Sequence, residues 1–346
     1  MIEMDVGTIV TSTDRYNEII RDRTVLTLIR HLARQDVGFS SDRLVNYLAG
    51  IKEFPFFSAR NLLSAAEAAG VNLIGRKVAI SEIRHCGTPF LTYMESLTET
   101  DHRVQLVEVI HVDKDRMTMS NGPAGPVDMS LKKLARFWTG VVFLTPYPGA
   151  SEEESELEAY RRQVAVLPSI LSDADCAEMI EYCEQRVFRR SRVSNGDERL
   201  ARAPGVIEQK VRNSTSLILE DRRYPLLDRL YRNIADLEGV DERDIEQIQC
   251  VRYKIGQRFT THFDAAVEVP RKTTYLLYLN RTFGGGDTYF PMLNLNVEPL
   301  TGNCLRFPSC DAAGRIYWQS EHGGLPVTNG TKYALNIWVH ISGKAV

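Results

Sequence analysis

Three residues in the second half of the chain have side chains that could hold a metal ion together. His262 and Asp264 lie two positions apart in a stretch rich in strand-forming residues, so their side chains would point to the same side of a strand. His322, from a distant strand, would complete a set of two imidazole nitrogens and one carboxylate oxygen. Such a set binds Fe(II) on one face and leaves positions open for a cosubstrate and O2. A His-x-Asp pair alone is a weak signal, because two polar residues on a surface strand give the same pattern.

Lys332 adds a charged group that needs a partner. It follows His322 by ten residues, and we expect it on the neighbouring strand. An ammonium group deep in a barrel is costly unless it meets an anion, and a dicarboxylate cosubstrate would supply one. Tyr253 precedes His262 by nine residues and could offer its hydroxyl to the same carboxylate.

Residues from about 160 to 346 resemble the prolyl 4-hydroxylase type of 2-oxoglutarate- and Fe(II)-dependent dioxygenase. The resemblance rests on motifs that occur in the family's order and at similar spacing. They are Arg252-Tyr253-x-x-Gly256-Gln257-x-Phe259-x-x-His262-x-Asp264, Gly285-Gly286-x-Thr288-x-Phe290-Pro291 and His322-x-Gly324-x-Pro326-Val327-x-x-Gly330-x-Lys332-Tyr333.

The resemblance implies that residues 161–346 form a double-stranded β-helix, or jelly roll, with supporting helices. It implies that His262, Asp264 and His322 are the catalytic Fe(II) ligands, and that 2-oxoglutarate and O2 are consumed, with ascorbate as an optional reductant. A zinc hydrolase could use the same three side chains. Lys332 and the Gly-Gly-x-Thr motif favour the oxygenase.

The resemblance also assigns residues around the metal. Lys332 would anchor the far carboxylate of 2-oxoglutarate, and Tyr253 and Thr288 are further candidates in that pocket. Arg212 stands in an Arg-x-Ser element that lies near the substrate in the family. An ordinary surface arginine fits this short motif equally well.

Apolar spacing predicts the elements of both halves. The first half combines helices with later strands, which is an α+β arrangement. Helices are expected over residues 13–35, 41–48, 58–69, 131–137, 172–186 and 225–237. Strands are expected over residues 77–80, 89–94, 103–111, 116–120 and 141–144, and over 163–167, 247–255, 272–279, 305–307 and 333–341.

The first half resembles a papain-like C39 peptidase domain. The resemblance follows the helix from Ala59, the Pro89 strand, the strand from His102 and the Phe137-Trp-Thr-Gly ending. His102 stands where the family has its histidine base, and Asn121 lies near the place of the orienting residue. A papain-like enzyme needs a cysteine nucleophile, here expected near residues 21–24. Since no cysteine precedes Cys86, we interpret the domain as a degenerate, non-catalytic one. An unrelated α+β domain is the alternative.

Composition predicts a two-domain protein without a nucleic-acid or membrane partner. The predicted division is a first domain at 1–148, a linker at 149–160 marked by Pro, Gly and an acidic run, and a second domain at 161–346. A net charge of −3 gives no positive electrostatic field that would attract nucleic acid. The sequence contains no run of eighteen apolar residues, so a membrane-spanning helix is not expected. Six cysteines without a CxxC pattern favour reduced thiols and a cytoplasmic protein. The pattern leaves the oligomeric state open.

Together these patterns predict a dioxygenase that hydroxylates a peptide or protein, with proline as the expected target and the first domain as a peptide-binding module. The alternative is a hydroxylase of a free amino acid or small metabolite. In that case the first domain would serve as a structural or interaction scaffold.

Overall fold

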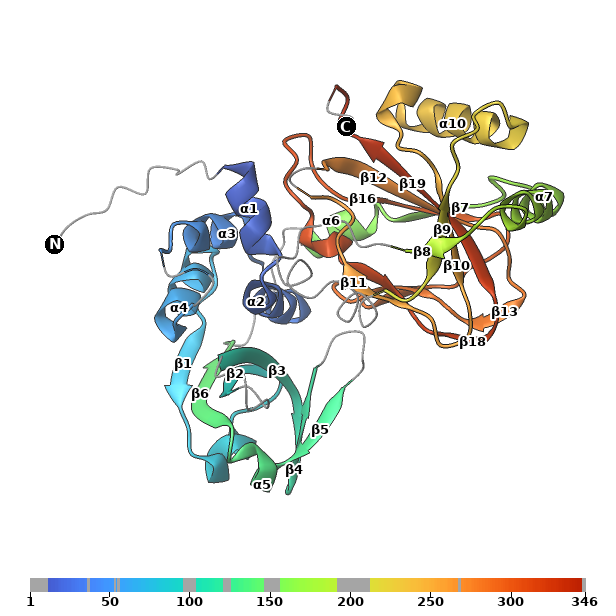
Figure 1. The fold of residues 1–346 in the computed structure, drawn as a ribbon. Helices are drawn as coiled ribbons and strands as arrows, with labels where there is room; N and C mark the ends of the chain where they lie inside the picture. The colour runs from blue at the N-terminus through green and yellow to red at the C-terminus, as the bar shows by residue number, and fades with distance from the viewer. Residues whose placement is uncertain are drawn as a thin grey trace. The chain divides into compact units, whose positions relative to one another are not determined.

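The computed structural model divides the chain into two compact units, residues 1–159 and 160–346 (Figure 1). The division falls at the end of the segment 149–160 that was predicted as a linker. No helix among the described residues is both long and apolar enough to span a membrane. The structure describes residues 12–35, 38–52, 54, 57–95, 104–120, 126–145, 156–191, 212–266 and 269–343.

The first unit begins with four short helices. The prediction of a single helix over residues 13–35 is wrong, because the helix is interrupted between α1 and α2. The Asp22 side chain accepts hydrogen bonds from the backbone N–H groups of Thr24 and Val25, at 2.8 and 3.2 Å, and so starts a new helix. The helices are α1 (Thr13–Ile20), α2 (Arg23–Arg34), α3 (Ser41–Ala49) and α4 (Ala59–Ala68).

A six-stranded antiparallel sheet follows these helices, which gives the expected α+β order. The strand predicted over 77–80 is wrong, because β1 ends at Lys77 and a 3-10 helix, η1 (Ile80–His85), follows. The strand order is β1-β6-β2-β3-β4-β5. The strands are β1 (Ile74–Lys77), β2 (Phe90–Glu95), β3 (Val104–Val112), β4 (Arg116–Met119), β5 (Val127–Ser130) and β6 (Trp138–Leu144), with the short helix α5 (Leu131–Leu134) between the last two.

A buried polar cluster ties α2 to this sheet. Glu108 on β3 accepts from Arg34 at 2.5 Å and lies 3.2 Å from His31 Nδ1, while His31 Nε2 lies 2.8 Å from the Thr145 hydroxyl. Burial acts to raise the pKa of the Glu108 carboxyl, but His31 and Arg34 outweigh it, so that the pKa is lowered. The carboxylate therefore stays ionised inside the unit.

The second unit is built from antiparallel sheets, which is consistent with the jelly roll of a 2-oxoglutarate oxygenase. The seven-stranded major sheet has the order β7-β16-β12-β19-β10-β9-β8, and the four-stranded minor sheet has the order β11-β17-β14-β15. The major strands are β7 (Ala165–Leu167), β8 (Arg189–Arg190), β9 (Thr215–Ile218), β10 (Gln249–Tyr253), β12 (Arg271–Tyr278), β16 (Cys304–Pro308) and β19 (Lys332–His340). The others are β11 (Phe259–His262), β14 (Thr288–Phe290), β15 (Leu295–Val297) and β17 (His322–Gly324), with β13 (Phe283–Gly285) and β18 (Val327–Gly330) as a separate pair.

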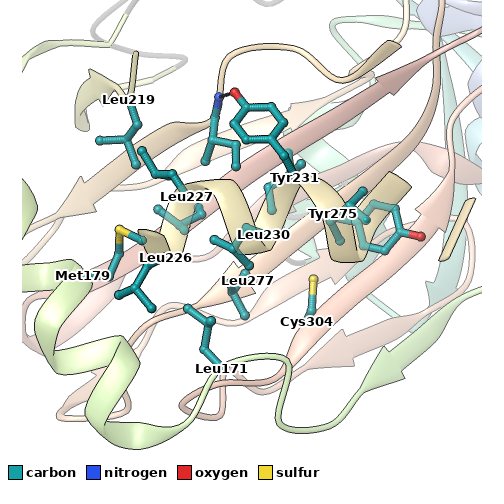
Figure 2. Packing of buried hydrophobic residues seen from close by; sticks show 14 of the residues in the cluster. Leu171, Met179, Leu219, Leu226, Leu227, Leu230, Tyr231, Tyr275, Leu277 and Cys304 are labelled. Carbon is teal, nitrogen blue, oxygen red and sulfur yellow. Dashed lines mark hydrogen bonds between the residues drawn. The ribbon is translucent and has the colours of Figure 1, made fainter. Parts of the chain in front are cut away.

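Helices pack on the major sheet and form the main core of this unit (Figure 2). The predicted helices at 172–186 and 225–237 are confirmed as α7 (Asp173–Glu184) and α10 (Pro225–Glu238). The other helical segments among the described residues are α6 (Glu156–Arg161) and the 3-10 turns η3 (Glu242–Asp244) and η4 (Trp318–Ser320). Helix α10 ends at Gly239, which adopts the left-handed conformation with φ 64°. Its buried face contributes Leu226, Leu227, Leu230, Tyr231 and Ile234.

Leu230→Ala should destabilise the second unit by about 2–5 kcal/mol, because Leu230 is fully buried and the substitution leaves a cavity. Leu237→Ala, in the same helix, is the matched control. Its side chain is 54% exposed, so the change should stay within about 0.5 kcal/mol. Urea unfolding of both variants checks this, and equal midpoints for the two would contradict the packing described.

Candidate metal centre

Strand pairing brings the three predicted metal ligands together. His262, the last residue of β11, lies directly opposite His322, the first residue of β17. Asp264 was expected on the same strand as His262 but lies just beyond its end. His262 Nε2 is 3.4 Å from Asp264 Oδ1, and His322 Nε2 is 3.6 Å from Asp264 Oδ2. One ligand atom from each residue lies within 4.8 Å of the others.

Each imidazole is oriented by the backbone carbonyl two residues before it. His262 Nδ1 lies 2.9 Å from the carbonyl oxygen of Thr260, and His322 Nδ1 lies 2.9 Å from that of Ser320. A carbonyl only accepts, so each Nδ1 carries the proton and donates it. Each Nε2 is then left with a lone pair facing the carboxylate. Two neutral imidazoles and one carboxylate in this arrangement fit a divalent iron ion.

The charge states of the cluster also suit a metal. Burial acts to raise the pKa of the Asp264 carboxyl, but His322 and His262 outweigh it and the pKa is lowered. The Thr274 hydroxyl donates to Asp264 Oδ2 at 2.8 Å, which further favours the ionised form. Burial lowers the pKa of His322 to about 4, although Asp264 opposes the shift. Near neutral pH both groups are therefore deprotonated, as ligation requires.

His262, Asp264 and His322 line a cavity of about 520 Å³. Residues of both sheets line this cavity, which is large enough for a small cosubstrate and part of a substrate. Each residue that the sequence marked as a site candidate contributes to its wall. These residues are Arg212, Tyr253, His262, Asp264, Thr288, His322 and Lys332.

Lys332 presents a buried cation to the cavity. Its Nζ donates to the carbonyl oxygen of Gly286 at 2.6 Å and lies 5.1 Å from the ring centre of Tyr278. In the described part of the chain, no carboxylate comes within 4.0 Å of this nitrogen. Burial lowers the pKa of Lys332 to about 8, with Asp287 acting in the opposite direction. A carboxylate of a bound ligand would supply the anion that this cation lacks.

The neighbourhood of Lys332 differs from the expectation in one respect. Lys332 was expected on the strand next to His322, but β17 and β19 belong to different sheets, with β18 between them in sequence. Its direct partner across the major sheet is Tyr253 on β10, with Nζ 5.8 Å from the tyrosine ring centre. Thr288, fully buried on β14, shares a hydrogen bond of 2.9 Å with the Tyr278 hydroxyl. Sequence reasoning missed Tyr278.

Sequence reasoning also missed a polar group at the other end of the cavity. Glu246 accepts from Arg271 Nε at 2.5 Å and from Arg271 NH2 at 2.8 Å, and lies 2.7 Å from His340 Nε2. The Arg271 guanidinium stacks over the ring of Trp338 at 3.8 Å. All four residues line the cavity.

Two of these side chains hold buried polar atoms without a partner. Trp338 Nε1 and His340 Nδ1 are buried and form no hydrogen bond with any residue that the structure describes. Buried polar atoms of this kind are costly unless a ligand satisfies them. The sequence contained a signal for both residues, because every second residue from Lys332 to His340 faces one side of β19. Extending that alternation from Lys332 reaches Trp338 and His340.

Comparisons with known proteins identify the class of this domain. Residues 248–340 match the 2OG-Fe(II) oxygenase superfamily. A putative prolyl 4-hydroxylase of Acanthamoeba polyphaga mimivirus is 27% identical over 186 residues, which cover 50% of this chain and 72% of that protein. Prolyl 4-hydroxylase subunit alpha-1 of Mus musculus is 29% identical over 187 residues, covering 51% of this chain and only 34% of the subunit. The viral collagen prolyl hydroxylase of Paramecium Bursaria Chlorella virus-1 in its 2OG complex aligns with a TM-score of 0.40 at 24% identity, over 51% of this chain and 95% of that chain.

The C-terminal half of the chain thus carries a 2-oxoglutarate–Fe(II) oxygenase domain. More narrowly, this domain is similar to prolyl 4-hydroxylases. Proteins of this superfamily require Fe(II), 2-oxoglutarate and O2, and the cluster of His262, Asp264 and His322 offers the donors that such an iron needs.

His262→Ala or His322→Ala should abolish tight binding of Co(II), a spectroscopic substitute for Fe(II), because two ligands hold the ion far less well than three. The same variants should release no succinate from 2-oxoglutarate. Visible absorption of the Co(II) protein measures the first effect and a succinate assay the second. Circular dichroism serves as the folding control, and near-normal succinate release from either variant would exclude this metal assignment.

Lys332→Ala should raise the dissociation constant of 2-oxoglutarate about thirty- to a hundredfold and leave metal affinity unchanged. A lost charge-assisted contact costs about 2–3 kcal/mol, at about 1.4 kcal/mol per factor of ten. Lys332→Arg should be milder, because it keeps the charge. Calorimetric titration of 2-oxoglutarate into the metal-loaded protein gives the dissociation constant of 2-oxoglutarate for each of the two variants. Unchanged affinity in Lys332→Ala would place the amine outside the cosubstrate pocket.

The affinity for 2-oxoglutarate should also depend on pH through the same group. The pKa of Lys332 is lowered to about 8, so the ammonium that attracts the anion is present below pH 8 and is lost above it. The dissociation constant should therefore be flat below pH 8 and rise about tenfold per pH unit above it. Lys332→Arg, which stays charged, should remove that rise.

Proposed function

We propose that this protein is a 2-oxoglutarate- and Fe(II)-dependent dioxygenase that hydroxylates a peptide or protein, with proline as the target residue. The observation that carries the proposal is the position of Lys332. A buried cation shares one cavity with a cluster of two histidines and an aspartate, and it lacks a carboxylate partner among the described residues. A chelating dicarboxylate would satisfy this cation, which favours the oxygenase over a hydrolytic metal centre.

Each residue has a defined task in this proposal. His262, Asp264 and His322 hold the iron, which, when bound with 2-oxoglutarate and O2, supplies the oxidative chemistry that hydroxylates a C–H bond. Lys332 binds the far carboxylate of the cosubstrate and so sets its orientation in the cavity. Buried Thr288 lies in the same pocket as a hydroxyl donor, held in place by its hydrogen bond to Tyr278.

Tyr253 and Arg212 remain proposals for the same cavity. Tyr253 pairs with Lys332 across the sheet, which supports a role beside the cosubstrate. Arg212 was predicted as a substrate residue, and it is 5% exposed in the cavity wall rather than on the surface. The ordinary surface arginine considered as the alternative is therefore wrong.

We place the substrate at the end of the cavity formed by Glu246, Arg271, Trp338 and His340. The indole N–H of Trp338 and the Nδ1 atom of His340 are buried polar groups that a peptide could satisfy. Arg271, stacked on Trp338 and paired with Glu246, gives this end a flat and rigid surface. The names of the relatives support proline as the target, since the two curated relatives described above are prolyl 4-hydroxylases by name.

For the first unit we propose a non-catalytic, peptide-binding role on a degenerate C39-type fold. The α+β order and the absence of a cysteine at the start of α2, where Arg23 and Thr24 stand, support it. His102 and Asn121, which the resemblance would use as base and orienting residue, lie outside the described residues. The cytoplasmic location and the absence of nucleic-acid and membrane partners stay predictions.

The alternative is hydroxylation of a free amino acid or small metabolite, with the first unit as a scaffold. A panel of proline-containing peptides, matched peptides without proline and free amino acids separates the two functions. Each is incubated with the full chain, Fe(II) and 2-oxoglutarate, and succinate and the added oxygen are measured by mass spectrometry. We expect both products with proline peptides only. Turnover with free amino acids alone would establish the alternative.

The role of the first unit has its own outcome in the same assay. If that unit binds peptides, the chain without residues 1–159 should show a higher KM for long peptides and an unchanged kcat for short ones. An unchanged KM for every peptide would leave the first unit as a scaffold. Peptide cleavage that a thiol alkylating reagent blocks would show that the unit is not degenerate.

A further inference from the structure

We propose that Phe259 and Arg212 are positioning residues for the iron ligand His262, stacked as a column behind its imidazole. The inference rests on the metal assignment of the proposed function and goes beyond it, because neither residue ligates the metal. It also assigns Arg212 a different task from contact with substrate.

The column is defined by two contacts. The rings of Phe259 and His262 lie 3.6 Å apart between centroids and are inclined by only 17°. The Arg212 guanidinium carbon lies 4.6 Å from the centre of the Phe259 ring. Since the imidazole covers one face of the Phe259 ring, the guanidinium takes the other. The benzene ring is thus held between a cation and the metal ligand.

A backbone irregularity makes the stacking of these two rings geometrically feasible. On a regular strand, residues three positions apart point to opposite faces. The register between β11 and β17 shifts between Phe259 and His262, and such a bulge re-aims side chains. Arg212 itself forms an isolated antiparallel bridge with Phe259, so the backbone delivers the guanidinium to the ring.

His262 needs this support more than His322 does. His322 is enclosed by the rings of Phe290 and Phe307, at 5.7 and 4.7 Å, and its side chain is 8% exposed. The His262 side chain is 18% exposed. Besides its hydrogen bond to the Thr260 carbonyl, its flat contact with Phe259 restricts rotation of the ring. A ligand that rotates freely loses the pre-organisation on which metal affinity depends.

The Arg212 guanidinium is itself fixed by protein groups. Nε donates to the Ser214 hydroxyl at 3.0 Å, NH2 donates to Gln249 Oε1 at 3.1 Å, and a further hydrogen bond joins it to the Tyr253 side chain. These contacts define its orientation over Phe259 before any substrate binds. They also connect the column to Tyr253, on the cosubstrate side of the cavity.

The test is metal binding without substrate or cosubstrate. Phe259→Leu keeps apolar volume but removes the flat ring, and it should weaken Co(II) affinity roughly ten- to a hundredfold, the usual effect of losing a residue that orients a ligand. The Co(II) visible spectrum should change as well, since the ligand geometry relaxes. Phe259→Tyr keeps the ring and should restore both affinity and spectrum.

Phe188→Leu is the matched control. Phe188 also carries an arginine over its ring, Arg252 at 4.1 Å, but it contacts no metal ligand, so its loss should leave Co(II) affinity unchanged. Arg212→Met removes the cation and leaves Phe259 in place, and it tests the column even if Phe259→Leu does not fold. We expect it to weaken Co(II) binding by a smaller, several-fold factor.

The outcomes separate this inference from the proposed function. If His262→Ala abolishes Co(II) binding while Phe259→Leu and Arg212→Met bind with normal affinity and spectrum, the column is overturned and the metal site stands. If His262→Ala itself binds Co(II) normally, the metal assignment falls as well. An Arg212→Met variant with normal metal binding and a raised KM for peptide alone would return Arg212 to the substrate.

Discussion

The antiparallel pairing of β11 with β17 is the constraint on which the rest of the second unit depends. It sets His262 directly opposite His322, and the chain after β11 returns Asp264 to the same point. A one-residue slip of this register would send one imidazole to the other face of the minor sheet. The carbonyl acceptors for both Nδ1 atoms come from the same two chain segments, at Thr260 and Ser320. Position and tautomer of the ligands therefore follow from one pairing.

The second constraint is the cost of buried charge. Asp264 and Lys332 are both buried, and neither would be stable there without opposite charge or hydrogen bonds. Asp264 has two imidazoles and the Thr274 hydroxyl. Lys332 has a carbonyl and two aromatic rings, which stabilise a cation only partly. The described protein groups thus leave an electrostatic deficit at Lys332 that a cosubstrate carboxylate would fill.

Much of the site could be predicted from the sequence because its residues lie in local motifs. The spacing of His262 and Asp264, and the motif from His322 to Lys332, describe strands whose faces can be read by alternation. Glu246 and Arg271 could not be found in this way. Their contact with each other and with His340 depends on the sheet order, which places β12 beside β19 and β19 beside β10. Likewise, no periodicity indicates that Phe259 stacks on His262, because the irregular register of β11 cancels the usual alternation.

In the first unit, the helices were predicted from apolar spacing, but their ends were set by short-range capping. Asp22 divides a continuous apolar pattern into α1 and α2 because its carboxylate satisfies the first N–H groups of a new helix. The strand expected at 77–80 failed for a related reason. Apolar residues at Val78 and Ile80 suit a strand, but Ala79 accepts a hydrogen bond from Glu82 and starts a 3-10 turn.

We propose that one cavity couples the oxidation of 2-oxoglutarate to hydroxylation of a peptide. The most direct measurement is turnover of the full chain with Fe(II), 2-oxoglutarate and a proline-containing peptide under isotopically labelled O2. Such coupling predicts one labelled oxygen in the hydroxylated peptide for each molecule of succinate formed. Succinate without any labelled peptide, across the peptide panel, would contradict it.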